Sequence, residues 1–217
     1  YEILRCLVGS EMCIRDSYEG NETPLLKVLH DNGINYIRIR IWNDPFNADG
    51  KTYGGGGNDV STGVEIAKEA AQYDMKVLLD FHYSDFWAEP AVQLVPKAWK
   101  KDVNNTEKMC SDVYDFTKES IQKFKDAGAN IGMVQVGNEI TNGLLGIYSN
   151  RDKGESFNVI WGDKKKSTEV NKYLKAGIKA VREYTPQALV ALHLETPNVW
   201  KYKTIMNTCC LLYTSDA

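Results

Sequence analysis

Asn138 and Glu139 stand next to each other at the end of an apolar run, within the segment MVQVGNEITNG at residues 133–143. A carboxyl group at the end of a buried strand can exchange a proton with a bound substrate. The adjacent amide can donate a hydrogen bond to a substrate hydroxyl. Sugar hydrolysis uses such groups together with a second carboxylate and with aromatic planes for the ring faces. On this pattern alone, Glu139 could equally be a structural partner of Arg38 or Arg40.

Other apolar runs also end in polar or aromatic side chains. In the segment YIRIRIW, three isoleucines alternate with Arg38 and Arg40, so the two arginines should share the opposite face and point into the fold. Buried guanidinium groups need carboxylate partners, for which Asp80 and Glu139 are the candidates. We predict Arg40, nearer the strand end, as the substrate contact and Arg38 as its structural support. The remaining candidate substrate contacts are Trp42, Asp80, His82, Trp87 and His193.

The elements that position these side chains follow from periodicity. Strand-like alternation and helix-like spacing take turns along the chain, which predicts right-handed βαβ units and a parallel sheet. A Thr-Pro start and a closing glycine bound the first expected helix. The expected strands cover 34–42, 75–82, 130–139 and 188–195, and the expected helices cover 23–33, 59–73, 106–127 and 168–184.

The loops distinguish between two architectures that fit this alternation. The long loops follow the strands, whereas the connections from helix to strand are short, which is typical of a (β/α)₈ barrel with its active face at the carboxyl ends of the strands. A doubly wound sheet should instead place a phosphate-binding glycine turn between a strand and its helix. The glycine-rich segment YGGGG at residues 53–57 does not fit that fingerprint. We therefore predict an α/β fold, a partial TIM barrel comprising about strands 2 to 5 with their helices.

Composition fits one soluble globular domain. The chain has 217 residues, of which 43% are hydrophobic and 25% charged, and its formal net charge of −3 argues against a nucleic-acid surface. The only dense basic run, Lys164 to Lys166, is expected in a polar loop, and no stretch has the length and apolarity of a membrane span. The five cysteines form no disulfide framework, and Cys110 is expected to be a packed thiol on a helix. We expect a monomer.

The two ends of the sequence differ from its body. The segments CLVGSEMCIRDS and CCLLYTSDA show neither helical nor strand periodicity, and both resemble peptides obtained when sequencing-adapter DNA is translated. We predict three parts: a non-native segment at 1–17, a partial catalytic domain at 18–207 and a second non-native segment at 208–217.

Several segments together resemble a known family. These are YIRIRIWNDPFNADGKTYGGGGND, MKVLLDFHYSDFWAEP, VPKAW and MVQVGNEITNG, continued by YLKAGIKAVREYTP and ALHLE. In order and spacing they are similar to glycoside hydrolase family 53, the arabinogalactan endo-β-1,4-galactanases. The resemblance covers nearly all of residues 24–194, and DFHYSDFW is its most specific part.

The resemblance implies a (β/α)₈ enzyme that cleaves β-1,4-galactan in type I arabinogalactan with retention of anomeric configuration. Glu139 matches the general acid/base of the family and Asn138 matches the asparagine before it. The family's nucleophile is a second glutamate on the seventh strand, which we expect to lie beyond this sequence, so we predict that the 217-residue chain is inactive on galactan. Glu195 and Asp80 are the nearest substitutes by strand position, but neither matches a family nucleophile. Galactan or galactooligosaccharides are the expected partners, without cofactor or metal, in the extracellular, periplasmic or cell-surface space of a bacterium.

One departure and two alternatives remain open. Where the family commonly has LLWP, this chain reads LLGI at residues 144–147, so Tyr148 or Trp161 could replace a missing aromatic platform. A metal-dependent barrel hydrolase could instead use two carboxylates and two imidazoles as zinc ligands. A galactan-binding fragment without turnover is the non-enzymatic alternative. The candidate zinc ligands are Asp80, His82, Glu139 and His193.

Overall fold

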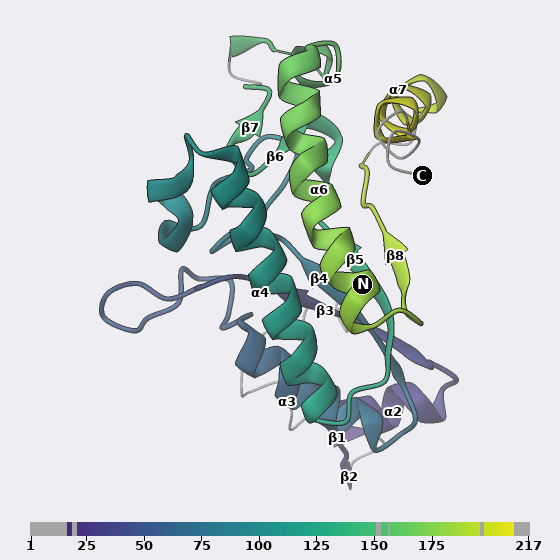
Figure 1. Cartoon of the computed structure of the whole chain (residues 1–217). Helices are drawn as coiled ribbons and strands as arrows, with labels where there is room; N and C mark the ends of the chain where they lie inside the picture. The colour runs from purple at the N-terminus through teal and green to yellow at the C-terminus, as the bar shows by residue number, and fades with distance from the viewer. Residues whose placement is uncertain (1–16, 19–20, 151–152, 156, 196–197, 211–217) are drawn as a thin grey trace.

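The computed structural model describes residues 17–18, 21–150, 153–155, 157–195 and 198–210 (Figure 1). Its centre is a four-stranded parallel sheet in which β3, β4, β5 and β8 are neighbours in the order in which they occur along the chain. Consecutive parallel neighbours are the arrangement of a (β/α)₈ barrel wall, whereas a doubly wound sheet reverses its strand order. The predicted fold class, part of a TIM barrel, is confirmed. The strands are β3 (Tyr36–Ile41), β4 (Lys76–Phe81), β5 (Ile131–Val136) and β8 (Leu189–Ala191).

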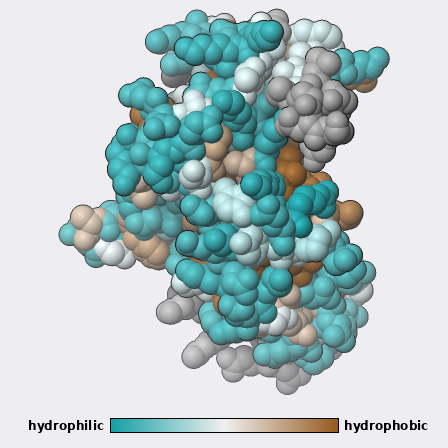
Figure 2. Space-filling model, in the orientation of Figure 1, coloured by the Kyte–Doolittle hydropathy of each residue, from teal (hydrophilic) through white to brown (hydrophobic). Residues whose placement is uncertain are grey.

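Three long helices cover the face of the sheet opposite the predicted site. They are α3 (Val60–Ala71), α4 (Thr106–Asp126) and α6 (Lys164–Tyr184). Figure 1 shows α4 and α6 running side by side across the sheet, and they pack against each other. Gly177 lets α6 approach closely, because a Cβ atom there would lie 2.8 Å from Val136 of β5. Figure 2 shows that this helical face is mostly hydrophilic.

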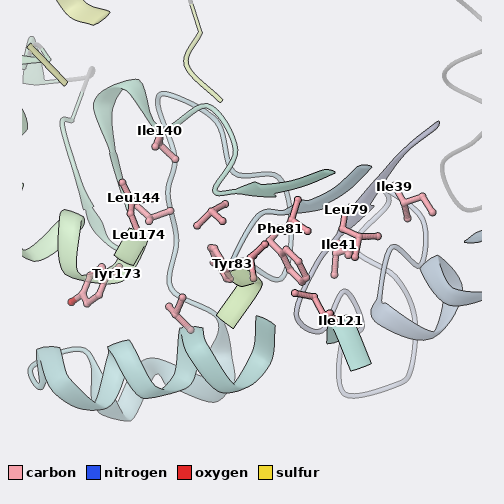
Figure 3. Packing of buried hydrophobic residues seen from close by; sticks show 14 of the residues in the cluster. Ile39, Ile41, Leu79, Phe81, Tyr83, Ile121, Ile140, Leu144, Tyr173 and Leu174 are labelled. Atoms are coloured by element: carbon pink, nitrogen blue, oxygen red, sulfur yellow. The ribbon is translucent and has the colours of Figure 1, made fainter. Parts of the chain in front are cut away.

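The core lies between the sheet and these helices. Ile37, Ile39 and Ile41 of β3 are buried on the helical side, which confirms that Arg38 and Arg40 share the other face. Figure 3 shows Ile41, Leu79 and Phe81 gathered beside Ile121 of α4. Fully burying one large apolar side chain of this kind stabilises the fold by about 1.5–3 kcal/mol. The core therefore fixes the plane of the sheet and, with it, the carboxyl ends of the strands.

Shorter elements complete the described chain. The expected first helix is present as α2, and an antiparallel pair of two-residue strands precedes it. None of the described helices is long and apolar enough to cross a lipid bilayer. The bounds of these elements are β1 (Ser17–Tyr18), β2 (Asn21–Glu22), α2 (Leu25–Asp31), η2 (Lys97–Asp102), η3 (Ile140–Asn142), β6 (Gly143–Leu144), β7 (Ile147–Tyr148), α5 (Asn158–Trp161) and α7 (Val199–Cys210).

The structure differs from the sequence-based expectations in two places. The Lys164–Lys166 run is the first turn of α6 and not a loop, because the Asp163 side chain accepts hydrogen bonds from the backbone N–H groups of Lys165 and Lys166. The last expected strand is shorter, since β8 pairs only over Leu189–Ala191. Helix α7 ends at Cys210, and most of residues 1–17 and 211–217 lie outside the described residues, so the domain boundaries at 17 and 207 stay predictions.

Candidate active site at the carboxyl ends of the strands

Glu139 lies at the turn that follows β5, and its backbone is in the left-handed region with φ 50° and ψ 46°. Residues other than glycine adopt this conformation at a cost, and such residues concentrate at functional sites. The half-buried side chain lines a hollow of about 270 Å³ together with most of the predicted site residues. These other lining residues are Arg38, Arg40, Asp80, His82, Trp87 and Asn138.

Asn138 is held by four hydrogen bonds. Its Oδ1 atom accepts from Nη2 of Arg38 at 2.8 Å, from Nδ1 of His193 at 2.7 Å and from Nε2 of Gln135 at 3.2 Å. Its Nδ2 atom donates to the carbonyl of Ala88 at 2.8 Å. Because a guanidinium can only donate, the contact with Arg38 fixes which end of the amide is the oxygen. His193 must therefore carry a proton on Nδ1, and its Nε2 atom is an acceptor when the ring is neutral.

Asp80 is a buried residue in the lining of the hollow, and both of its carboxylate oxygens have partners. Its Oδ2 atom lies 2.9 Å from Nη2 of Arg38 and 3.3 Å from Nε2 of His82, and its Oδ1 atom accepts from Nε2 of Gln135 at 2.5 Å. The expected contact of Asp80 with Arg38 is confirmed. A carboxylate that is paired and hydrogen-bonded in this way organises its neighbours and is poorly suited to attack a substrate.

His82 has its tautomer set by two neighbours. The backbone N–H of Ala88 donates to Nδ1 at 3.1 Å, so the proton of the neutral ring sits on Nε2 and faces Asp80. Burial lowers the pKa of His82, although the nearby carboxylate of Asp80 opposes this effect. The ring is therefore a neutral link between the strand end and the loop after it.

Arg40 stacks against aromatic rings. Its Cζ atom lies 3.6 Å from the ring centroid of Trp87 and 5.2 Å from that of Trp42, which is cation–π geometry. Burial lowers the pKa of Arg40 to about 10, so the group keeps its charge at neutral pH. Its Nη1 atom is buried and makes no hydrogen bond within the described part of the chain.

The two tryptophans differ in exposure. Trp87 is 45% exposed, so its ring can stack on a sugar. Trp42 has no exposed surface, and it packs against Phe86 and Trp87. The expectation that Trp42 contacts the substrate is therefore corrected: its buried ring meets that of Trp87 edge to face and supports it. Trp161 is likewise buried, with its Nε1 atom donating to the carbonyl of Thr141 at 2.7 Å, so it does not provide the replacement platform.

Glu139 is in an environment that favours its protonated form. Burial raises the pKa of Glu139 most, and the charges of Glu195 and Glu89 raise it further, while Arg38 opposes them. A carboxyl group with a raised pKa keeps its proton to higher pH than an ordinary glutamate, which suits it to protonate a leaving oxygen.

Comparison with known proteins identifies the family. Residues 7–210 match glycosyl hydrolase family 53. The chain belongs to this family. It is 42% identical over 190 residues to the endo-β-1,4-galactanase of Bacillus subtilis (strain 168), a match that covers 87% of this chain and 40% of the relative. An arabinogalactan endo-β-1,4-galactanase from Humicola insolens is 36% identical over 126 residues, covering 58% of this chain and 35% of that protein.

Solved structures of family 53 proteins share the fold. The GH53 catalytic domain of Ignisphaera aggregans superposes with a TM-score of 0.79 and 32% identity, over 98% of this chain and 57% of that one. Fungal β-1,4-galactanases give a TM-score of 0.70 with 27% identity, over 88% of this chain and 51% of theirs. The chain thus spans between about a third and three fifths of the length of these relatives.

The metal-centre alternative does not fit the family 53 site. Asp80 and His82 contact each other and their other neighbours, and His193 is bonded to Asn138. Among the described residues, no group of three or more His, Cys, Asp and Glu side chains converges as a metal site would require.

Sequence reasoning missed two glutamines of this family 53 site. Gln135 bonds to Arg38, Asp80 and Asn138, and Gln93 reaches the turn after β5 from the loop after β4. A polar residue in the middle of an apolar strand was the available signal for Gln135. Gln93 lies in an irregular loop, where no periodicity could reveal it. Arg38, expected only as a support, is the arginine that contacts Asn138.

Proposed function

We propose that this chain carries the acid/base half of the catalytic centre of a retaining endo-β-1,4-galactanase. Glu139 is the general acid that protonates the departing galactose oxygen and then the base that activates water. Asn138, His193 and Arg40 contact the sugar hydroxyl groups, and Trp87 stacks on a sugar ring. The single observation that carries this proposal is the half-buried Glu139 carboxyl with its raised pKa, lining a hollow beside the exposed ring of Trp87.

The substrate class rests on the relatives. The Bacillus subtilis and Humicola insolens proteins bear galactanase names, and this chain is similar to both. Site chemistry agrees with a neutral polysaccharide: the Nδ2 atom of Asn138 has a second hydrogen to donate, and Nε2 of His193 can accept. An extracellular, periplasmic or cell-surface location in a bacterium remains our prediction.

Retention requires a second carboxyl group about 5–5.5 Å from the first. Among the described residues, Asp80 is paired with the cation of Arg38 and hydrogen-bonded by His82 and Gln135. Glu195 matches no nucleophile of the family, and its backbone N–H donates to the hydroxyl of Thr141, which in turn donates to the backbone carbonyl of Glu195. We therefore assign the nucleophile to the glutamate that the family resemblance places on the seventh strand, and we expect no galactan hydrolysis from the 217 residues alone.

Hydrolysis is tested in a chimera. In this longer protein, residues 18–207 replace the corresponding segment of the Bacillus subtilis galactanase. We expect release of galactooligosaccharides from β-1,4-galactan, with the β-anomer formed first in proton NMR spectra. Glu139→Gln should reduce kcat by about 10²–10⁴-fold. Hydrolysis unaffected by this substitution would contradict the proposal.

Binding without turnover is the alternative for the 217-residue chain. It is favoured by the exposed Trp87 ring, which needs no second carboxylate to hold a sugar. Titration of the chain with β-1,4-galactotetraose by calorimetry measures it directly, with cellotetraose as the control. Equal binding of the two oligosaccharides would contradict specificity for galactan.

A further inference from the structure

Gln93 connects two loops that both border the Glu139 hollow. It lies in the loop after β4, and only 1% of its surface is exposed. Its Nε2 atom donates to the carbonyl of Asn138 at 2.9 Å and to that of Glu89 at 3.1 Å, and it lies 3.4 Å from the carbonyl of Glu139. The backbone carbonyl of Gln93 accepts a hydrogen bond from the backbone N–H of Gly146 at 2.6 Å. One buried residue thus joins the loop after β4 to the turn that carries the catalytic carboxyl.

The orientation of the Gln93 amide is set by its neighbours. Three carbonyl oxygens, those of Glu89, Asn138 and Glu139, face the same end of the amide, so that end must be the NH₂ group. The Oε1 atom at the other end is buried and has no hydrogen-bond partner within the described part of the chain. An unsatisfied buried acceptor destabilises the fold. The Gln93 amide is therefore held in the orientation that satisfies its NH₂ donors and leaves its Oε1 acceptor without a partner among the described residues.

The donor side acts on a strained segment. Glu139 has φ 50°, so its carbonyl and that of Asn138 leave the sheet and turn toward the loop after β4. Binding both carbonyls restricts rotation of the two peptide planes that flank the Cα atom of Glu139. These rotations decide whether the carboxyl points into the hollow or away from it.

We propose that Gln93 is a positioning residue for the catalytic centre: its amide holds the carbonyls of Asn138 and Glu139 and so fixes the left-handed conformation that aims the Glu139 carboxyl into the hollow. The inference rests on the proposed function, because it gives Glu139 the acid/base role. Gln93 itself touches no substrate. A misplacement of about 1 Å in a catalytic group costs on the order of 10²-fold in rate.

Gln93→Met removes the donors and keeps most of the volume. In the chimera we expect kcat on galactan to fall by about 10–100-fold, while KM changes by less than about threefold, because Gln93 does not contact the sugar. The matched control is Gln122→Met, since the Gln122 amide bonds, among the residues that the structure describes, only to Asp126 on the exposed side of α4. That variant should keep the wild-type kcat. An unchanged kcat in Gln93→Met would overturn the inference.

Gln93→Glu adds a test that distinguishes loss of the hydrogen-bond donor from general misfolding. The ionised carboxylate would repel the carbonyls, whereas the protonated acid can donate one hydrogen bond. We expect its kcat relative to wild type to recover as pH falls, and a pH-independent ratio would overturn the inference. The Glu139→Gln chimera distinguishes failure of this inference from failure of the proposed function. A wild-type kcat in Glu139→Gln would contradict the proposed function. A reduced kcat in Glu139→Gln together with a wild-type kcat in Gln93→Met would contradict only the role of Gln93.

Discussion

Arg38 and Asn138 lie 100 residues apart in sequence, and Nη2 of Arg38 donates to Oδ1 of Asn138 at 2.8 Å. The same Nη2 atom lies 2.9 Å from Oδ2 of Asp80. One guanidinium therefore ties the ends of β3, β4 and β5 together and sets the amide orientation of the residue beside Glu139. Because the sugar would meet Asn138, the arginine acts on substrate binding through its neighbour.

Arg38→Met should destabilise the fold. It leaves the buried Asp80 carboxylate without its cationic partner, and losing a hydrogen bond to a charged buried group costs about 1.5–3 kcal/mol. Urea unfolding of the 217-residue chain measures this difference. Lys27→Met, which breaks an exposed pair with Asp31, is the control and should leave the unfolding midpoint unchanged. A midpoint for Arg38→Met equal to that of wild type would show that the pair adds nothing.

His82 should make stability depend on pH. Burial holds its pKa in the folded state below the ordinary value of 6.5, so the unfolded chain binds protons more readily in the window below 6.5. The contribution of this group to stability is complete above about pH 6.5 and is lost as pH falls through the folded-state pKa. Unfolding free energies measured from pH 8 to pH 5 should decline, and the decline should be smaller in His82→Gln. An identical decline in that variant would assign the effect to other groups, such as His193, whose pKa burial also lowers.

Glu139 should make the stability of the fold depend on pH in the opposite direction. Its pKa in the folded state lies above the ordinary value of 4.5, so the folded state holds this proton more tightly than the unfolded chain. The stabilising contribution is complete below about pH 4.5 and is lost as pH rises through the folded-state pKa. Glu139→Gln should therefore be more stable than wild type at pH 7 and equal to it near pH 4, by urea unfolding. If Glu139→Gln were less stable than wild type at pH 7, the folded state would instead stabilise the ionised carboxylate, which would contradict the raised pKa.

Trp87→Ala should weaken galactooligosaccharide binding. The ring is 45% exposed on one side and backed by Arg40 at 3.6 Å, so it presents a fixed plane to a sugar. Losing the burial of an aromatic side chain costs about 1.5–3 kcal/mol, or roughly tenfold or more in Kd. Calorimetry with galactotetraose measures the change. Trp200→Ala on α7 is the matched control, because Trp200 is 54% exposed and does not line the Glu139 hollow. Equal losses of affinity in Trp87→Ala and Trp200→Ala would contradict a specific sugar-stacking role for Trp87.

Sequence patterns predicted the parts of this structure that depend on local chemistry. Alternation in YIRIRIW placed Arg38 and Arg40 on the inner face, because successive side chains of a strand point to opposite sides. Strand ends then brought Asp80, His82 and Asn138 to one edge of the sheet, as parallel pairing requires. The contact of Asp80 with Arg38 followed from the need of a guanidinium on the inner face for a carboxylate partner.

Features that depend on tertiary contacts could not be predicted in this way. The burial of Trp42 results from the approach of Gly55, where a Cβ atom would lie 2.6 Å from the indole. Gln93 gains its role only because the loop after β4 folds over the turn after β5. The start of α6 depended on the capping side chain of Asp163, which precedes the apolar periodicity by several residues.

The most direct test of the role of Glu139 compares two substrates in the chimera carrying Glu139→Ala. Galactan needs acid assistance to expel its leaving sugar, whereas a dinitrophenyl β-galactoside does not, because its leaving group is a weak base. We predict that the substitution lowers kcat/KM on galactan by about 10²–10⁴-fold, spares cleavage of the dinitrophenyl bond, and allows added azide to restore turnover with formation of a β-galactosyl azide. Equal losses on both substrates, or an α-configured azide product, would contradict an acid/base role for Glu139 in a retaining enzyme.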